Sequence, residues 1–226
     1  RPPRSTPSNS SAASDVYKRQ QMNSLAQLFL FLPGILLALT LHEVAHGWVA
    51  DRLGDPTARL SGRLSLNPLV HLDPLGTLML FIAHFGWAKP VPINPYYFKD
   101  PKRDIIWVSL AGPAANVLAA ALCGVLFRWF NSLDLRLLST MAVYAVLINL
   151  ILAVFNLIPI PPLDGSKVLM GLLPAGQEYR FHTLERWGPV ILIGIILLNY
   201  YVPVLSLVIS PFVNFFGKLF TGYKFL

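Results

Sequence analysis

The sequence predicts an all-α polytopic membrane protein with about four to five transmembrane helices, a re-entrant segment and a short extended or hairpin region. Of its 226 residues, 54% are hydrophobic and 13% are charged, and the mean hydropathy is +0.56. Soluble domains carry about 25% charged residues. The 19 prolines and 15 glycines lie within and between apolar runs, where broken transmembrane helices tolerate them. A collagen-like or low-complexity chain is therefore excluded.

The first segment, residues 1–21, is rich in Ser, Pro, Arg and Asn and has almost no apolar periodicity. We expect it to be a disordered leader, because it also lacks the apolar stretch of a secretory signal. Met22 resembles a natural start, so residues 1–21 would be a translated upstream or cloning-derived sequence. Residues 22–226 are predicted to form a single domain.

Five apolar runs follow, at residues 25–50, 72–85, 105–130, 137–160 and about 189–219. A helix needs about 20 apolar residues to cross a bilayer, and shorter runs are more often re-entrant. Four runs are long enough, whereas 72–85 is not. The last run contains Pro203 and Pro211, which favours either one kinked span or two shorter helices.

Ionisable residues inside the first apolar run are the strongest functional signal. His42, Glu43 and His46 spell His-Glu-Val-Ala-His, in which the two imidazoles lie on one helical face and can bind one zinc ion. Glu43 is then placed to take a proton from a zinc-bound water. A chance match is the alternative, but an unpaired glutamate would oppose membrane insertion by several kcal/mol.

A hydrolytic zinc site normally has three protein ligands, and Asp164 is the candidate for the third. It follows the 137–160 run in Asn-Leu-Ile-Pro-Ile-Pro-Pro-Leu-Asp-Gly, residues 156–165. The prolines prevent a regular helix there, so the carboxylate can point sideways into a cavity. On its own the segment would be interpreted as a solvent-exposed turn, but the upstream motif favours the ligand.

These two motifs resemble the signatures of the site-2 protease family of intramembrane zinc metalloproteases. The similarity extends through residues 66–76, 86–92 and 111–116, and so covers nearly all of 22–216. The chain is most similar to the compact bacterial-type branch that has no inserted PDZ domain. The resemblance implies one Zn²⁺ ion per chain, bound by His42, His46 and Asp164. It also implies that Glu43 is the catalytic acid and base, and that Asn156 helps to orient the substrate or the oxyanion.

The ligand set also constrains the topology, because both motifs must reach the same depth in the membrane. The histidine pair lies near the end of its span, and Asp164 follows the end of another, so these two helices must be parallel. If 72–85 crossed the membrane they would be antiparallel, so it is expected to re-enter without crossing.

Basic residues then predict which face carries the site. Connectors 51–104 and 161–188 share the site face and contain ten of them, namely Arg52, Arg59, Arg63, Lys89, Lys99, Lys102, Arg103, Lys167, Arg180 and Arg186. The other face has four, Arg128, Arg136, Lys218 and Lys224, if the last run crosses once. The site is therefore expected at the cytoplasmic face of the cell membrane.

The expected partners are the lipid bilayer and a membrane-protein substrate that contains a transmembrane helix. The net charge of +7 is scattered over short connectors, which favours anionic lipid headgroups over nucleic acid. Cys123 is the single cysteine, so neither an intrachain disulfide nor a cysteine-based metal site can form. The sequence does not predict an oligomeric state.

Several alternatives stay open. His71 could be a fourth ligand or a gate, although a capping or interfacial role is the simpler interpretation. Asn116 and Asn149 are expected to form hydrogen bonds between helices. For the whole chain, the competing functions are a membrane metal-binding or transport protein and an inactive scaffold for membrane helices. Glu43 argues against both, because neither function needs a general base.

Overall fold

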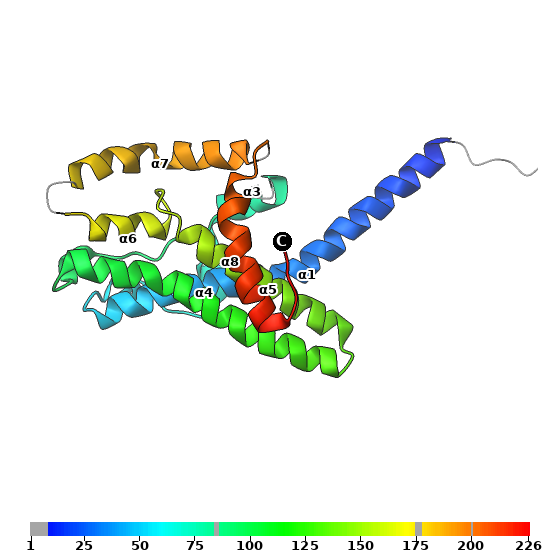
Figure 1. The fold of residues 1–226 in the computed structure, drawn as a ribbon, viewed down its shortest axis with the longest axis horizontal. Coiled ribbons are helices and arrows are strands. Elements are labelled where there is room, and N and C mark those ends of the chain that lie inside the picture. The colour runs from blue at the N-terminus through cyan, green and yellow to red at the C-terminus, as the bar shows by residue number, and fades with distance from the viewer. Residues whose placement is uncertain (1–8, 84–85, 175–177, 200) are drawn as a thin grey trace, which may run out of the picture.

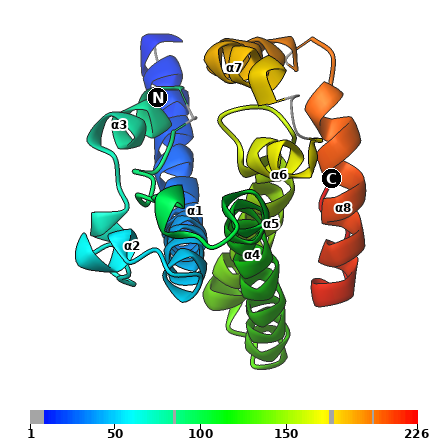
Figure 2. The ribbon, with the colours of Figure 1, turned by 90° about the vertical axis from the view of Figure 1, so that its left-hand side faces the viewer.

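The fold is known from a computed structural model that describes residues 9–83, 86–174, 178–199 and 201–226. The described chain is helical and contains no strand. Its α-helices are α1 Asn9–Arg52, α2 Thr57–Leu60, α3 Pro74–Ala83, α4 Pro101–Ser132, α5 Arg136–Asn156, α6 Asp164–Leu172, α7 Glu178–Leu198 and α8 Val204–Thr221. Short 3-10 turns are present at Pro68–Val70 and Pro95–Tyr97. Figure 2 shows α1 on one side and α8 on the other, with α4 and α5 between them.

Helix α1 begins earlier than expected. It continues through residues 9–21, where we expected a disordered leader, and that expectation is wrong for these positions. Residues 10–21 contain no proline, and an existing helix extends at low cost once nucleated by its apolar part. Residues 1–8 lie outside the described residues, and the division into a leader and a domain at Met22 stays a prediction.

Helices α1 and α5 are parallel, as predicted. Phe31 of α1 stacks on Tyr144 of α5 with ring centroids 4.2 Å apart, and further along both helices Gly34 lies against Ala145 and Ile148. Helix α4 is antiparallel to them, because it pairs Asn116 with the middle of α1 and Val108 with the later part of α1. The later part of α1 packs on α4 and α5, and the three helices form the centre of the fold (Figure 1).

The main apolar core lies where α4, α5 and α8 meet. Its buried members include Ala120, Val146, Leu150 and Val213. Small residues on α4 and α5 let the helices approach closely, which is how helices associate in a lipid environment that offers no hydrophobic driving force between them. The core therefore fixes α4 and α5, the two helices that frame the later part of α1.

Helix α3 confirms the expected short segment, because its 10 residues are too few to cross a bilayer. The expected short extended or hairpin region is present in its extended form, without paired strands. The described residues contain only an isolated antiparallel bridge between Leu72 and Ala88, followed by an irregular stretch to Asn94. Pro90 and Pro92 explain why the pairing extends no further, since a proline donates no hydrogen bond to a neighbouring strand.

The last apolar run forms two helices rather than one kinked span. Helix α7 ends at Leu198 and α8 begins at Val204, and Asn199 accepts a hydrogen bond from the backbone of Leu205 in the break between them. Along α8, Val213 packs near Ala120 and the carbonyl of Phe220 accepts from Arg128, so α8 runs in the same direction as α4. The chain therefore leaves α5 and enters α8 at the same face.

Four described helices are long and apolar enough to span a membrane, at Phe29–Arg52, Pro101–Ser132, Arg136–Asn156 and Val204–Thr221. The number agrees with the predicted four to five, and the chain is a membrane protein. Because α8 runs from the site face to the other face, Lys218 and Lys224 share a face with Arg128 and Arg136. The helices therefore agree with a single crossing of the last run, on which the count of ten against four basic residues depends, and the orientation stays a prediction.

This topology predicts which positions share a face. Single cysteines at Thr57, Lys99 and Lys167, in a Cys123→Ala background, should react with a membrane-impermeant thiol reagent from the same side of sealed vesicles. A cysteine at Ser132, beyond the end of α4, should react only from the opposite side. The Cys123→Ala chain is the control and should not react. Labelling of Lys99→Cys and Lys167→Cys from opposite sides would show that the spans are wrongly assigned.

Candidate metal centre

Two histidines on α1 begin the site. His42 and His46 are one helical turn apart, so their rings project from the same face, and their Nε2 atoms lie 3.0 Å apart. Both side chains are buried, at 5% and 6% exposed. The two histidines therefore share one helical face, as the sequence predicted, and their side chains lie in a buried interior.

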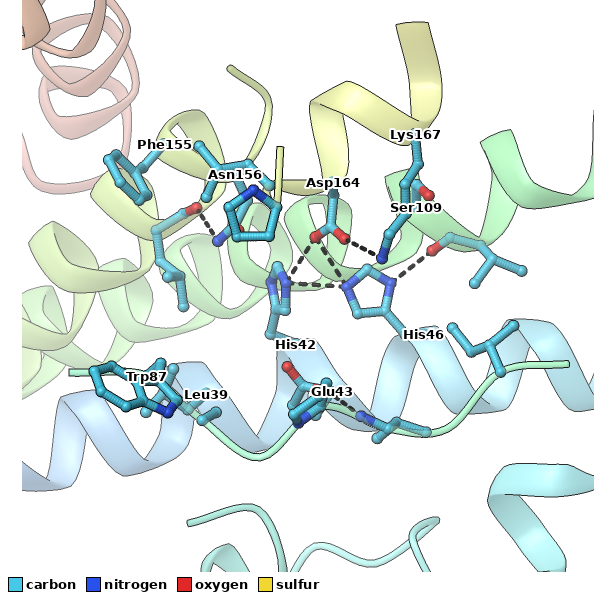
Figure 3. Close-up of a pocket in the computed structure, with 18 of the residues that line it drawn as sticks. Leu39, His42, Glu43, His46, Trp87, Ser109, Phe155, Asn156, Asp164 and Lys167 are labelled. Atoms are coloured by element: carbon cyan, nitrogen blue, oxygen red, sulfur yellow. Dashed lines mark hydrogen bonds and ion pairs between the residues drawn. The ribbon is translucent and has the colours of Figure 1, made fainter. Parts of the chain in front are cut away.

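Asp164 joins them from the first turn of α6. Its Oδ2 atom lies 3.0 Å from the Nε2 atom of each histidine, as Figure 3 shows. Helix α5 ends at Asn156, and the proline-rich turn after it delivers Asp164 to the histidines. Gly165 permits this turn, because a Cβ atom there would lie 2.2 Å from the carbonyl oxygen of Leu157.

The three residues form the single group of metal-ligand type found among the described residues. The ring geometry shows that they fit a metal ion. The Nδ1–H of His42 donates to Oδ1 of Asn116 at 2.6 Å, and the Nδ1–H of His46 donates to the Val108 carbonyl at 2.7 Å. Each Nε2 atom therefore presents a lone pair, the arrangement typical of metal-binding histidines.

Three acceptor atoms consequently converge on one point. Two imidazole lone pairs and a carboxylate oxygen repel each other in a buried site unless a cation lies among them. Tetrahedral zinc with ligands at about 2.0–2.2 Å separates its ligand atoms by roughly 3.4 Å, which is close to the 3.0 Å seen here. The donor set and its spacing both suit Zn²⁺.

The ionisation of Asp164 suits this role as well. Its helix, α6, lies outside the four candidate spans. Burial raises the pKa of the Asp164 carboxyl, whereas hydrogen bonds and positive charge from His42 and His46, when their Nε2 atoms carry protons in place of a metal ion, lower it well below its usual range. Asp164 is therefore a carboxylate, the form that binds metal.

An amide pair holds His42 in place. Asn116 of α4 accepts from His42 and donates through Nδ2 to the Ala38 carbonyl at 3.0 Å and to Oδ1 of Asn149 at 2.9 Å. Asn116 and Asn149 are both fully buried. The predicted bonds between helices are confirmed, and they also orient a histidine. Loss of such a partner typically weakens metal binding by about 10- to 100-fold.

Glycine at position 112 lets α4 touch the ligand atoms. A Cβ atom there would lie 2.4 Å from Nε2 of His46 and 2.7 Å from Nε2 of His42. Any side chain at this position would occupy the space next to the ligand atoms. The sequence alone gives no sign of this role, because the atoms next to Gly112 lie on α1, far away in the chain.

A cavity of about 400 Å³ opens beside the cluster. Glu43 lines it and accepts a hydrogen bond at Oε2 from the backbone N–H of Val91, at 2.8 Å. Figure 3 shows Glu43 on the opposite side of the two histidines from Asp164, Ser109 and Lys167. A carboxylate and a group of polar side chains therefore flank the ligand cluster from two directions.

The polar side chains on the Asp164 side have different hydrogen-bonding states. Asn156 lines the cavity, but its Nδ2 donates to the Leu152 carbonyl at 3.0 Å. The Ser109 hydroxyl is buried and has no hydrogen-bond partner among the described residues. Lys167 Nζ lies 3.6 Å from Oδ1 of Asp164. Ser109 and Lys167 were missed as site residues, because no local pattern distinguishes them.

His71 has a different role. It is 1% exposed and its Nε2 atom pairs with the Ser65 carbonyl at 2.8 Å, while its own carbonyl accepts from the backbone N–H of Lys89. It does not belong to the ligand group. Its contacts support the structural interpretation rather than a fourth ligand.

Comparison with known proteins agrees with this geometry. The model of peptidase family M50 matches residues 130–199, which include Asn156 and Asp164. "Putative zinc metalloprotease YwhC" of Bacillus subtilis (strain 168) is 35% identical over 187 residues, covering 80% of this chain and 84% of the relative. The chain belongs to the M50 family, the site-2 proteases.

Other relatives have names of the same kind. "Putative zinc metalloprotease Rip2" of Mycolicibacterium smegmatis is 34% identical over 175 residues, covering 74% of this chain and 66% of the relative. "Putative zinc metalloprotease MJ0611" of Methanocaldococcus jannaschii is 31% identical over 163 residues, covering 70% and 71%. No solved structure matches the chain. This M50 protein is accordingly a zinc metalloprotease of the membrane.

The ligand assignment predicts zinc loss on substitution. His42→Ala, His46→Ala and Asp164→Asn should each reduce the zinc content of the purified M50 protease to a small fraction of wild type, measured by metal analysis after dialysis against a weak chelator. Each change leaves two ligands where zinc needs three. Asp134→Asn, at an exposed turn, is the matched control and should retain zinc. Full zinc content in Asp164→Asn would mean that the third ligand lies elsewhere.

Gly112 provides an independent test of the same geometry. Gly112→Ala should abolish zinc binding although it changes no ligand, because the added methyl group would clash with both Nε2 atoms. Gly194→Ala places the same methyl group where no atom lies within 4 Å and should bind zinc normally. Equal zinc content in the two variants would contradict the close approach of α4 to the histidines.

Proposed function

We propose that this M50 protease is an intramembrane endopeptidase, which hydrolyses peptide bonds within or beside the transmembrane segment of another membrane protein. One zinc ion per chain would be bound by His42, His46 and Asp164. The main support is that the ligand group and Glu43 share one cavity, and that both histidines belong to a helix able to span the membrane. A substrate peptide bond would then meet the zinc site within the bilayer.

The residues divide the hydrolysis between them. A zinc ion held by these residues would polarise the scissile carbonyl and would lower the pKa of the attacking water toward about 7. Glu43 accepts the proton of that water at its carboxylate and later delivers the proton to the leaving amine nitrogen. The unpaired hydroxyl of Ser109 is available to donate to the substrate carbonyl oxygen. Asn156 retains a second N–H for the same purpose, which supports its predicted role in orienting substrate or oxyanion.

The cavity wall favours an apolar substrate. Leu39, Trp87, Phe155 and Leu192 line it together with the polar residues described above. Side chains of this kind accept the apolar residues of a membrane helix, whereas a charged peptide would lose its hydration there without compensation. A helix must also unwind locally before cleavage, because its carbonyls are hydrogen-bonded in the helix and its side chains cover them.

The site would face the cytoplasm of the cell that carries it. Ten basic residues lie on the site face and four on the other, which supports this orientation by the positive-inside rule. Lys167 lies at the cavity and is partly exposed, so water can be retained near the ligands from that side. Cleavage there would release the cytoplasmic part of a substrate, as regulated intramembrane proteolysis requires.

Glu43→Gln tests the proposed chemistry. The variant should retain zinc but lose cleavage by at least about 1000-fold, because the amide cannot accept the proton and is not a ligand. Wild type and variant would be co-expressed with a panel of tagged single-span membrane proteins, and cleavage scored by the size of the tagged fragment. Glu185→Gln, an exposed change on α7, is the matched control and should cleave normally.

Two outcomes would contradict parts of the proposal. Loss of zinc from Glu43→Gln would mean that Glu43 is a ligand rather than the base. If wild type cleaves soluble peptides but leaves every single-span protein intact, the proposed membrane substrate is contradicted. The metalloprotease assignment is unaffected by that outcome.

A further inference from the structure

The contact on Glu43 is provided by an unusual stretch of backbone. Val91 lies between Pro90 and Pro92, neither of which has an N–H, so residues 90–92 carry a single backbone donor. That donor is directed at Glu43, with 2.8 Å between the Val91 nitrogen and Oε2. The two prolines also fix their own φ angles, which limits how far the donor can move. The segment therefore presents one N–H in a restricted position.

Both sides of this segment are anchored to the connector between α1 and α3. Before Val91, the N–H of Lys89 donates to the His71 carbonyl at 2.8 Å. Arg63 donates through Nη2 to the carbonyls of Lys89 at 2.6 Å and Pro90 at 3.3 Å. After Val91, the N–H of Asn94 donates to Oδ2 of Asp55 at 2.7 Å. Four hydrogen bonds therefore fix the backbone on either side of the Glu43 contact.

The two charged anchors are themselves buried. Arg63 is 7% exposed and Asp55 is 0% exposed. Burying a charge is costly unless strong hydrogen bonds compensate, and bonds with one charged partner are about twice as strong as neutral ones. Asp55 also accepts from the backbone N–H and the hydroxyl of Thr57. The connector between α1 and α3 therefore holds residues 90–92 through buried, charge-assisted hydrogen bonds.

The Val91 side chain is held against α1 as well. It is 6% exposed, and a Cβ atom added to Gly47 would lie 3.1 Å from its Cγ1. Gly47 is one turn after Glu43 on α1. The segment therefore packs on the helix that carries the general base, at the level where its N–H meets the carboxylate.

We infer that Arg63 and Asp55 are positioning residues, which hold the Val91 N–H on Oε2 of Glu43 and so direct Oε1 toward the reacting water. The inference rests on the proposed role of Glu43. A free glutamate side chain has rotamer entropy to lose before it can act. Fixing one oxygen in the resting enzyme removes part of that cost, and a general base misplaced by about 1 Å can lose about 100-fold in rate.

Amide hydrogen exchange tests the contact without any substrate. The protein would be the zinc-loaded full chain in detergent, and the readout the exchange rate of the Val91 amide, which is simple to isolate because its proline neighbours have no amide hydrogen. Glu43→Ala and Arg63→Ala should each speed this exchange by at least about 10-fold. Arg59→Ala, which removes an exposed arginine paired with Asp51, is the matched control and should leave the rate unchanged.

Kinetics then test the consequence for catalysis. On a cleaved membrane substrate, Arg63→Ala should lower kcat by about 10- to 100-fold with KM and zinc content unchanged, and Arg63→Lys should recover part of the loss. Asp55→Asn is a second variant, in case Arg63→Ala unfolds, and should act in the same direction. A change in KM alone would overturn the inference, since it would make the segment a substrate-binding edge.

The exchange and cleavage experiments can fail independently of each other. If Glu43→Ala leaves Val91 exchange at the wild-type rate, the contact does not exist in the enzyme and the inference fails, whatever the protease cleaves. If exchange responds as expected but wild type cleaves no membrane helix, the contact between Glu43 and Val91 is supported and the proposed substrate is contradicted.

Discussion

Three buried acceptor atoms at mutual distances of 3.0 Å are the constraint on which the rest of this structure depends. Two imidazole lone pairs and a carboxylate oxygen cannot remain so close in an apolar interior unless a cation balances them. The surrounding helices must therefore supply groups that keep the rings turned inward, and the chain must bring a distant aspartate to the depth of α1. Each main feature of the fold meets one of these needs.

The depth requirement determines the topology. Asp164 follows α5, so α5 has to run parallel to α1, and the segment between α1 and α4 cannot cross the membrane. Helix α3 satisfies this, because its 10 residues are too few to cross a bilayer. The same requirement explains why α5 stops at Asn156 and why Gly165 follows the aspartate, since the turn between α5 and α6 must fold back closely on Leu157.

The sequence predicted what depends on neighbours in the chain. The pairing of His42 with His46 follows from helical periodicity. The 72–85 run is too short to cross a bilayer, and its length alone predicts this. Asp164 was predicted because it is an acid at the end of a long apolar run, and the histidine pair needs a third ligand. The roles of Asn116, Gly112 and Ser109 could not be predicted in this way. All three lie on α4, more than 60 residues from the histidines, and only the packing of α4 on α1 brings them to the site.

One structural expectation failed for an identifiable reason. The disordered leader is helical from Asn9, because low apolar content does not prevent a helix from extending an adjacent stable one. The composition of residues 9–21 therefore does not decide their conformation, because the adjacent apolar part of α1 nucleates the helix.

The two carboxylates of the site are held by different means, and the difference follows from their proposed roles. Asp164 has Lys167 near its second oxygen, and a cation there is compatible with a ligand that must stay ionised. A general base has to accept a proton, and an adjacent cation would oppose that step. Glu43 is held instead by the neutral N–H of Val91, while the guanidinium of Arg63 binds the carbonyls of the residues just before it. The positive charge therefore stabilises the backbone that positions the base, and its hydrogen bonds are made to neutral carbonyls rather than to the carboxylate itself.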